Sequence, residues 1–172
     1  ERIDINGNTS TLDRGIRRQF SIAEGDPFNR NEIRAAREKI RALGLFSIAE
    51  VNILRGQTSS KVIVDVNVRE KPTGSLSFGA GYSSANGLGG IIEYGEKNFL
   101  GRGQSLSFAI KTGKDDQLYE FSFFEPMFLR NDLSFGFNVS WKDTNKQNAN
   151  YDTSALELQP YLIFPIGDKS TL

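Results

Sequence analysis

The stretch Gly74–Ser84, GSLSFGAGYSS, decides how the rest of this chain is interpreted. Leu76, Phe78, Ala80 and Tyr82 fall on one parity, and glycine or serine fills the positions between them. Because successive side chains of a strand point to opposite faces, this segment is predicted to be a strand with one apolar face and one small, polar face. The pattern predicts a β-sheet, with this segment as its first strand.

The same alternation recurs in further segments downstream of this stretch. Pro72, just before it, marks a predicted boundary between a domain at 1–72 and a domain at 73–172. Each predicted strand has about 9 to 12 residues, and a tilted strand needs about 9 to 11 to cross the hydrocarbon layer of a membrane. Of the 19 aromatic residues, 16 lie after residue 73. This combination is typical of a transmembrane β-barrel. The six predicted strands are 74–84, 89–98, 103–112, 117–125, 132–142 and 154–164.

The two faces of these strands are predicted to meet different solvents. A lysine on the lipid face near mid-bilayer would cost roughly 2–4 kcal/mol, so the parity that holds Lys111 is expected to face a water-filled lumen, together with Ser77, Glu120 and Glu157. A soluble antiparallel sandwich shows the same alternation, and this alternative stays open. The residues expected to face lipid are Phe78, Phe108, Phe121, Phe137 and Leu158.

Residues 1–72 begin with a predicted strand and a predicted helix. The strand covers 2–6, where Ile residues alternate with polar ones. The helix stripe repeats every four residues, and Ser10 is the predicted N-cap. The residues of this stripe are Leu12, Ile16 and Phe20.

A second helix and two more strands complete a β-α-α-β-β order. Asn29 and Glu32 are spaced as a capping box at the start of this helix, and Gly44 is its predicted stop. Strands are predicted at 48–53 and 62–68. The buried stripe of the helix is predicted to be Ile33, Ala36, Ile40 and Leu43.

The composition excludes several classes of chemistry. The chain has no cysteine and no histidine, which removes thiol nucleophiles, Ser-His-Asp triads and zinc sites with Cys or His ligands. The first 72 residues carry a net charge of +3 and the rest −3, which is too little to indicate nucleic-acid binding. No acid–base pair stands out, so we expect no enzymatic activity, no metal and no cofactor. The chain begins inside a predicted strand, so we expect it to be a piece of a longer protein.

Two glycine motifs and one acidic pair have structural explanations. Gly101-Arg-Gly103 and Gly79-Ala-Gly81 do not lie between a strand and a helix, so a turn and a close-packed strand are predicted in place of phosphate loops. Asp115-Asp116 lies in a polar loop with no third ligand in sight, so we expect it to be hydrated and not to bind a divalent cation.

Further segments carry a resemblance to a known family. Asn98-Phe-Leu-Gly-Arg-Gly103, Phe124-Glu-Pro-Met-Phe128 and Glu70-Lys-Pro-Thr-Gly74 resemble motifs of the outer-membrane protein insertase family, specifically its BamA branch. Through Glu24-Gly-Asp-Pro-Phe-Asn29 and Leu43-Gly-Leu-Phe46, residues 1–72 resemble a polypeptide-transport-associated (POTRA) domain. The resemblance implies an α+β POTRA domain, the last of a series, followed by the first six strands of a sixteen-stranded, antiparallel outer-membrane β-barrel.

The resemblance also implies a function: folding and inserting β-barrel proteins by templating client strands on the first barrel strand. An open strand edge offers unpaired N–H and C=O groups, which are costly in hydrocarbon and which a client strand would satisfy. On the POTRA domain, an edge at Ile48, Val51 and Ile53 is expected to bind a partner or client. The expected client-pairing edge consists of Gly74, Ser75, Leu76, Ser77, Phe78, Gly79, Ala80, Gly81 and Tyr82.

The implied partners are unfolded outer-membrane proteins, accessory lipoproteins of the assembly complex and the lipid bilayer, with the POTRA domain in the periplasm of a Gram-negative bacterium. Two other functions stay open. A two-partner-secretion type translocation pore of the same superfamily would have the same layout. A soluble POTRA-like binding module fused to a β-sandwich would not depend on detergent.

Overall fold

The structure is a computed structural model that describes residues 2–58, 61–84, 87–129, 133–145 and 152–164. It is mostly antiparallel β-structure with few helices. The contacts divide the chain into two compact units. The first comprises Glu1–Thr73 and Leu100–Gly103, and the second comprises Gly74–Phe99 and Gln104–Leu172.

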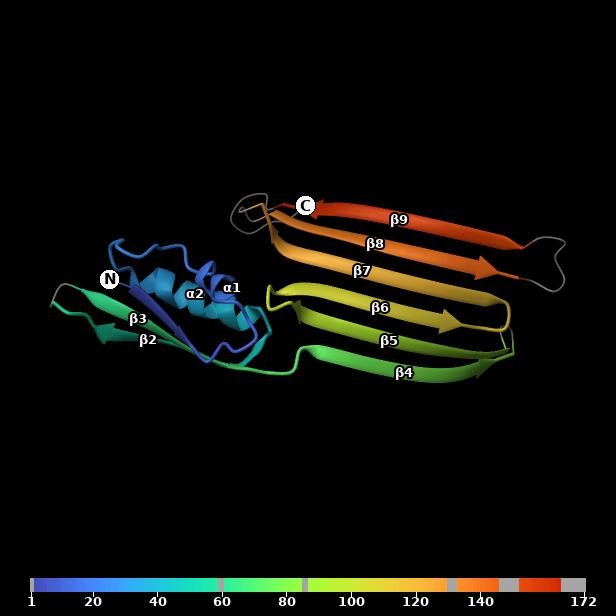
Figure 1. Cartoon of the computed structure of the whole chain (residues 1–172), viewed down its shortest axis with the longest axis horizontal. Helices are drawn as coiled ribbons and strands as arrows, with labels where there is room; N and C mark the ends of the chain where they lie inside the picture. The colour runs from blue at the N-terminus through green and yellow to red at the C-terminus, as the bar shows by residue number, and fades with distance from the viewer. Residues whose placement is uncertain (1, 59–60, 85–86, 130–132, 146–151, 165–172) are drawn as a thin grey trace. The chain divides into compact units, whose positions relative to one another are not determined.

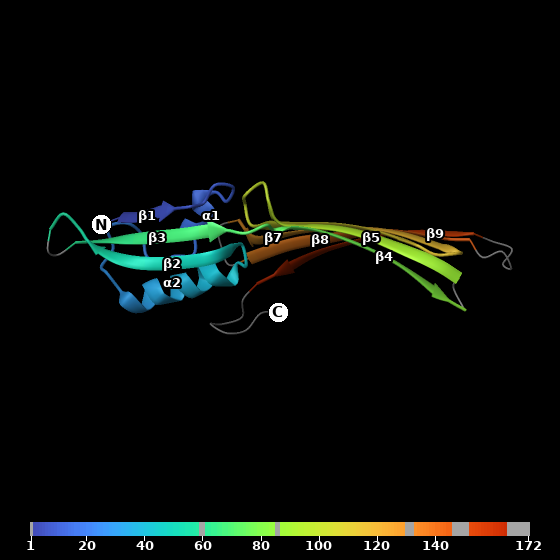
Figure 2. The same cartoon turned by 90° about the horizontal axis from the view of Figure 1, so that it is seen from below.

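The first unit has three strands and two helices. In its sheet β3 is the middle strand, with β1 parallel to it on one side and β2 antiparallel on the other. The longer helix, α2, lies against one face of this sheet (Figure 2). In chain order the elements are β1 (Arg2–Asn6), α1 (Asp13–Arg17), α2 (Arg30–Ala42), β2 (Phe46–Arg55) and β3 (Val62–Glu70).

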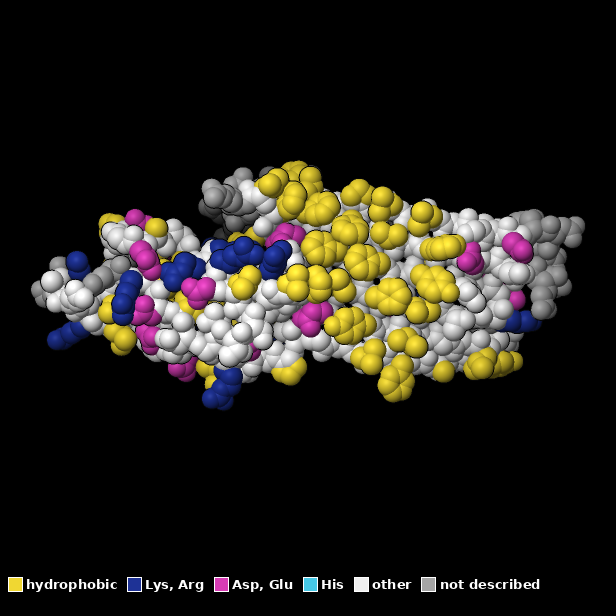
Figure 3. All heavy atoms as spheres, in the orientation of Figure 1, with side chains coloured by type: hydrophobic (Ala, Val, Ile, Leu, Met, Phe, Trp, Pro, Cys, Tyr) yellow, Lys and Arg dark blue, Asp and Glu magenta, His cyan; other side chains and the backbone are white. Residues whose placement is uncertain are grey.

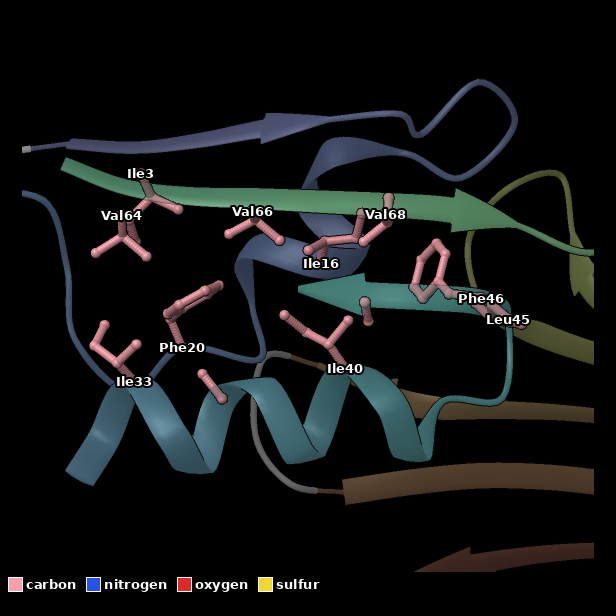
Figure 4. Close-up of a cluster of buried hydrophobic side chains, with 12 residues drawn as sticks. Ile3, Ile16, Phe20, Ile33, Ile40, Leu45, Phe46, Val64, Val66 and Val68 are labelled. Carbon is pink, nitrogen blue, oxygen red and sulfur yellow. The ribbon is translucent and has the colours of Figure 1, made fainter. Parts of the chain in front are cut away.

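The hydrophobic core of this unit lies between α2 and the sheet (Figure 4). The predicted stripe of α2 is confirmed, because Ile33, Ala36 and Ile40 are buried and Leu43 packs against the core. Alternation places every second residue of β3 in the same core. The buried residues are Ile3, Ile16, Phe20, Ile33, Ala36, Ile40, Leu45, Phe46, Ala49, Val64, Val66 and Val68.

The two helices begin differently. At α2 the predicted cap is confirmed, since Asn29 Oδ1 accepts the Asn31 N–H at 3.0 Å. At α1 the prediction of a Ser10 cap is wrong. This helix spans only Asp13–Arg17, and Leu12 occupies its N-cap position without a side-chain cap bond. Phe20 lies beyond the end of this helix and is nevertheless buried.

The second unit is one antiparallel sheet in which each strand pairs with its neighbours in the chain (Figure 1). Seen nearly edge-on, it is a single layer of strands (Figure 2). It is an open sheet, with β4 and β9 as its end strands. The strands are β4 (Gly74–Ser83), β5 (Gly87–Phe99), β6 (Gln104–Thr112), β7 (Asp116–Phe128), β8 (Leu133–Thr144) and β9 (Thr153–Ile163).

Strand β7 runs three residues past its predicted end. The sequence predicts that it stops at residue 125, before Pro126, but β7 continues to Phe128 with a register shift between Glu125 and Phe128. A bulge tolerates proline because the inserted residues need not donate to the ladder. The Gly101-Arg-Gly103 motif forms the β5–β6 turn, where both glycines have positive φ, as expected for a turn. The sequence also predicts a tight turn at 165–170 and a polar loop at 142–153. The turn and residues 146–151 of the loop lie outside the described residues.

Candidate functional site

The first strand of the large sheet, β4, has a partner on one side only. It pairs with β5 from Gly74↔Glu96 to Ser83↔Gly87 without a register shift. Within the described part of the chain no strand pairs with its other edge. All ten of its residues are exposed, and the nine residues predicted for client pairing lie in this strand. Such an edge leaves backbone N–H and C=O groups open to another chain.

The small side chains of β4 leave this edge uncrowded. A Cβ atom at Gly81 would meet nothing within 4 Å, and one at Gly79 would lie 3.2 Å from Ile91 Cγ2. Opposite Gly81 lies Gly89, so two backbones face each other there without side-chain contact. Cross-strand side-chain pairs supply much of a sheet's stability. The β4–β5 pair therefore depends mainly on backbone hydrogen bonds at this level.

One face of the large sheet, which includes Phe78 and Phe108, carries large apolar side chains (Figure 3). This face is here called the outer face. Phe78 is 85% exposed and Leu158 is 65% exposed, as no core residue of a water-soluble unit would be. All five residues predicted to face lipid lie on this face. One continuous row across the six strands is Leu76, Tyr94, Phe108, Phe121, Val139 and Leu158.

Aromatic residues dominate the outer face of β7 and β8. The Phe137 ring lies 5.7 Å from that of Phe121 and 5.6 Å from that of Phe123. At the margin of the apolar region, Trp141 Nε1 donates to Asp143 Oδ1 at 3.1 Å and to Ser154 Oγ at 2.8 Å. An indole with its ring on apolar neighbours and its N–H on polar ones is typical of a membrane–water interface.

The apolar region of the outer face is slanted relative to the strands. On β4 and β5 it runs from Leu76↔Tyr94 to Tyr82↔Leu88, and on β8 and β9 from Phe135↔Leu162 to Trp141↔Leu156. Followed through the pairing register, its midpoint thus moves by about four residues over four strand spacings. With a rise of about 3.4 Å per residue and a spacing of about 4.8 Å, this gives a strand tilt of about 35°. Transmembrane barrel strands tilt by about 35–45°.

The inner face is polar and carries acidic side chains in register. Lys111 Nζ lies 2.5 Å from Glu120 Oε2, and both belong to the parity predicted to face a lumen, as do Ser77 and Glu157. This face contributes to a hollow of about 560 Å³. One inner row across the six strands is Ser77, Glu93, Ala109, Glu120, Ser140 and Glu157.

In the first unit, β2 is an end strand, and within the described residues no strand pairs with its outer edge. The Ile3 N–H donates to Glu24 Oε1, and it therefore points away from β3. Since Ile3 pairs with Val64, the backbone of Val64 faces β1, and Ile53, its partner on β2, then faces away from the sheet. Alternation gives Val51 the same orientation. By the same alternation, the backbone N–H and C=O of Ile48, the third predicted edge residue, point toward β3.

Glu70, in the junction motif at the end of β3, holds the segment between β1 and α1. Its carboxylate accepts the N–H of Thr11 at 2.6 Å and of Ser10 at 2.9 Å, and the hydroxyl of Thr9 at 2.8 Å. Burial alone would raise the pKa of Glu70, but these hydrogen bonds outweigh it and lower the pKa to about 2. Sequence reasoning missed this contact because its partners are about sixty residues apart.

No group of three or more potential metal-ligating side chains occurs among the residues that the structure describes. No helix in those same residues is long and apolar enough to cross a bilayer.

Family models match both units of the chain. Residues 1–71 match the POTRA model, described as surface antigen variable number repeat, and residues 98–172 match the Omp85 superfamily domain. The class defined by the fold is therefore a POTRA domain joined to strands of an Omp85 β-domain. The outer membrane protein assembly factor BamA of Neorickettsia risticii is 30% identical over 158 residues, which make up 90% of this chain and 21% of that protein. The two family matches together cover residues 1–71 and 98–172, and over most of its length the chain is similar to BamA proteins.

Solved structures agree with this similarity. BamA from Haemophilus ducreyi lacking POTRA domains 1–3 superposes with a TM-score of 0.82 at 26% identity, over 99% of this chain and 33% of that chain. CdiB from Acinetobacter baumannii gives a TM-score of 0.64 at 12% identity, over 98% of this chain and 34% of that chain, which shows a shared fold alone. The chain spans about one fifth of the length of the curated relatives that it matches.

Proposed function

We propose that this chain takes part in the assembly of outer-membrane β-barrel proteins, with β4 as the strand on which a client strand is templated. The observation that carries this proposal is the combination of a free edge on β4 with an apolar outer face. In hydrocarbon each unpaired backbone N–H or C=O costs several kcal/mol. A client strand that pairs with β4 removes this cost for both chains.

Templating of this kind reads the backbone of the client more than its side chains. The glycine and serine side chains of β4 suit it because they do not obstruct an incoming strand. The proposed activity forms no covalent bond and needs no cofactor or metal. We therefore do not regard the chain as an enzyme.

The two units would occupy different compartments. The outer face of β4–β9 would lie in the bilayer of the outer membrane as the first strands of a barrel, with the inner face toward a wet lumen. The first unit, with its β-α-α-β-β order, would be the last POTRA domain of a series and lie in the periplasm. There the β2 edge at Val51 and Ile53 would receive clients or accessory lipoproteins.

Two alternatives predict different behaviour. A translocation pore of the same superfamily would conduct ions or a secreted partner through its lumen. A soluble binding module would bury the apolar face against a second sheet. In the described part of the chain the only other sheet has its own helix and core in the first unit, which argues against a sandwich.

The templating proposal can be tested by crosslinking, because the chain has no cysteine of its own. Ser75→Cys places a thiol on the free-edge strand, and Ser107→Cys places one on the inner strand β6 in the same inner-face row. We expect an unfolded barrel client with scanned cysteines to crosslink at position 75 during assembly and not at 107. Equal crosslinking at both positions would show that β4 is not the template.

The bilayer proposal has a separate test. Spin labels at Phe108 and Lys111 lie on opposite faces of β6. In lipid vesicles, oxygen should quench the label at 108 more strongly, and a water-soluble nickel chelate the label at 111. Equal access of the chelate to both labels would rule out a membrane wall.

A further inference from the structure

The other end strand of the small sheet is β1. On its outer edge, the backbone N–H and C=O of Ile3 are hydrogen-bonded to two side chains. The Ile3 N–H donates to Glu24 Oε1 at 3.1 Å, and the Ile3 carbonyl oxygen accepts from Arg17 at 3.1 Å. Arg17 and Glu24 also form an ion pair at 2.7 Å. Together they offer Ile3 one acceptor and one donor, which is what a residue of a neighbouring strand would offer.

The Arg17–Glu24 pair is held in place by residues close to it in the sequence. Arg17 is the last residue of α1, and a second carboxylate, Asp13, receives its guanidinium at 3.2 Å. Glu24 lies in a turn where the Ala23 N–H donates to Asp26 at 2.7 Å and Gly25 takes a φ of 98°. The hydrogen bond from Ile3 and the Arg17 guanidinium lower the pKa of Glu24, so the carboxylate is ionised at neutral pH. This gives the Glu24–Asn29 motif a structural role.

The opposite edge of the sheet differs. On β2, Arg41 Nε donates to the Ala49 carbonyl oxygen at 3.3 Å. Beyond it, Val51, Ile53 and Arg55 also point their backbones outward by alternation, and within the described residues no side chain bonds to their backbone. On β1 only Ile5 remains outward and uncapped. A strand partner would find three successive open residues on β2 and one isolated residue on β1.

We infer that the Arg17–Glu24 pair closes the β1 edge to strand addition, so that an extended segment of a client adds to the first unit at β2 alone. The inference rests on the proposed function in that the partner is a strand of a barrel client. The pair acts as a specificity determinant: it sets which edge is read and hence the direction of the added strand.

The test compares two matched thiols on the two edges. Asp4→Cys on β1 and Asn52→Cys on β2 both lie opposite Asp65, in one row on one face of the sheet. The probe is a synthetic peptide with the sequence of residues 133–144 of this chain and cysteine in place of Asn138, as a model barrel strand. The full chain in detergent micelles is mixed with the peptide under mild oxidation.

In the intact chain we expect crosslinking at 52 and little at 4. In Arg17→Met/Glu24→Ala, crosslinking at 4 should rise by about tenfold, as expected for two backbone hydrogen bonds made available. The control, Arg37→Met, removes an ion pair of similar exposure on α2, leaves the Arg41–Glu38 pair in place and should change neither yield. A peptide with prolines in place of Gly136 and Ser140 should crosslink nowhere.

Each outcome decides one claim. Equal crosslinking at 4 and 52 in the intact chain, or no gain at 4 in the folded double variant, overturns the closure. A gain at 4 with no crosslink at 52 supports the closure and contradicts the β2 edge of the proposed function. If the double variant does not fold, amide exchange in Glu24→Ala decides. The closure predicts faster exchange at Ile3 and no change at Ile5, and unchanged exchange at Ile3 overturns it.

Discussion

The two units of this chain place their apolar side chains in opposite ways. In the first unit twelve hydrophobic residues are buried between a helix and a sheet. None of these twelve comes from β4–β9, where Leu76, Phe78 and Leu158 are each at least 65% exposed. Both units nevertheless use the same alternation along their strands. The difference shows that strand pattern specifies a face, whereas the surroundings decide what that face contacts.

The comparison predicts opposite responses to charge. A charge on the core face of the first unit should be intolerable in any solvent. A charge on the outer face of the second unit should be intolerable only in a bilayer.

Ile40→Asp should unfold the first unit. Ile40 is completely buried on α2, and burying an unpaired charge there should cost at least about 4 kcal/mol, most of the stability of so small a unit. Amide exchange should lose protection at Val66. The control Ile40→Val should cost about 0.5–1.5 kcal/mol. A protected Val66 amide in Ile40→Asp would mean that this cluster is not the core.

Leu158→Lys should cost roughly 2–4 kcal/mol in lipid vesicles, because it puts a charge near the middle of the apolar region. Its neighbour on the inner face supplies the control: Glu157→Lys should stay within about 0.5 kcal/mol. Both are measured as unfolding free energies by urea titration of vesicle-embedded protein. Equal small effects would indicate that the outer face meets water, and the contrast between the units would disappear.

Gly136→Ala should destabilise the second unit by about 1–3 kcal/mol. Its Cβ would lie 2.3 Å from Tyr161 Cζ, and the Tyr161 ring stacks on Phe124 at 6.5 Å. The matched control is Gly81→Ala, which meets open space and should change stability by less than about 0.5 kcal/mol. The same titration measures both. Similar values for the two variants would show that the Tyr161 ring moves aside at no cost.

Glu70→Gln should destabilise the first unit by about 1–2 kcal/mol at pH 7, a figure reduced for partial solvent exposure. The folded pKa of about 2 lies below the ordinary value of 4.5. The stabilisation is therefore complete above about pH 4.5 and disappears as the pH falls toward 2. Denaturant unfolding of both proteins from pH 7 to pH 2 should show the difference vanish over this range. A difference that is independent of pH would exclude the ionised carboxylate as its cause.

The sequence predicted the strands well because alternation is local. All six strands of the second unit were found within a few residues of their ends, and the stripe of α2 followed from its spacing. The first helix was less predictable. The backbone N–H groups of Ser10 and Thr11 are bound by Glu70 from the far end of the unit, and the local sequence gives no sign of this long-range contact.

Two kinds of feature left no signal in the sequence. Leu100 and Leu129 adopt positive φ at turns, where glycine or asparagine would have announced the conformation. The hydrogen bonds of Ile3 to Arg17 and Glu24 join residues up to 21 positions apart. Nothing in the spacing of Arg17 and Glu24 indicates that both would bond to the backbone of one residue. Such contacts follow from the fold and could be recognised only once it was known.

The slant of the apolar rows also determines how a wall of this kind would curve. A shift of about one residue per strand corresponds to a shear number of about 16 for a sixteen-stranded cylinder, with a radius of about 15 Å. The six strands would then cover about three-eighths of its circumference. Side chains cannot fill an interior of that width, so the glycines and serines of β4 would line an aqueous bore wide enough to admit a polypeptide.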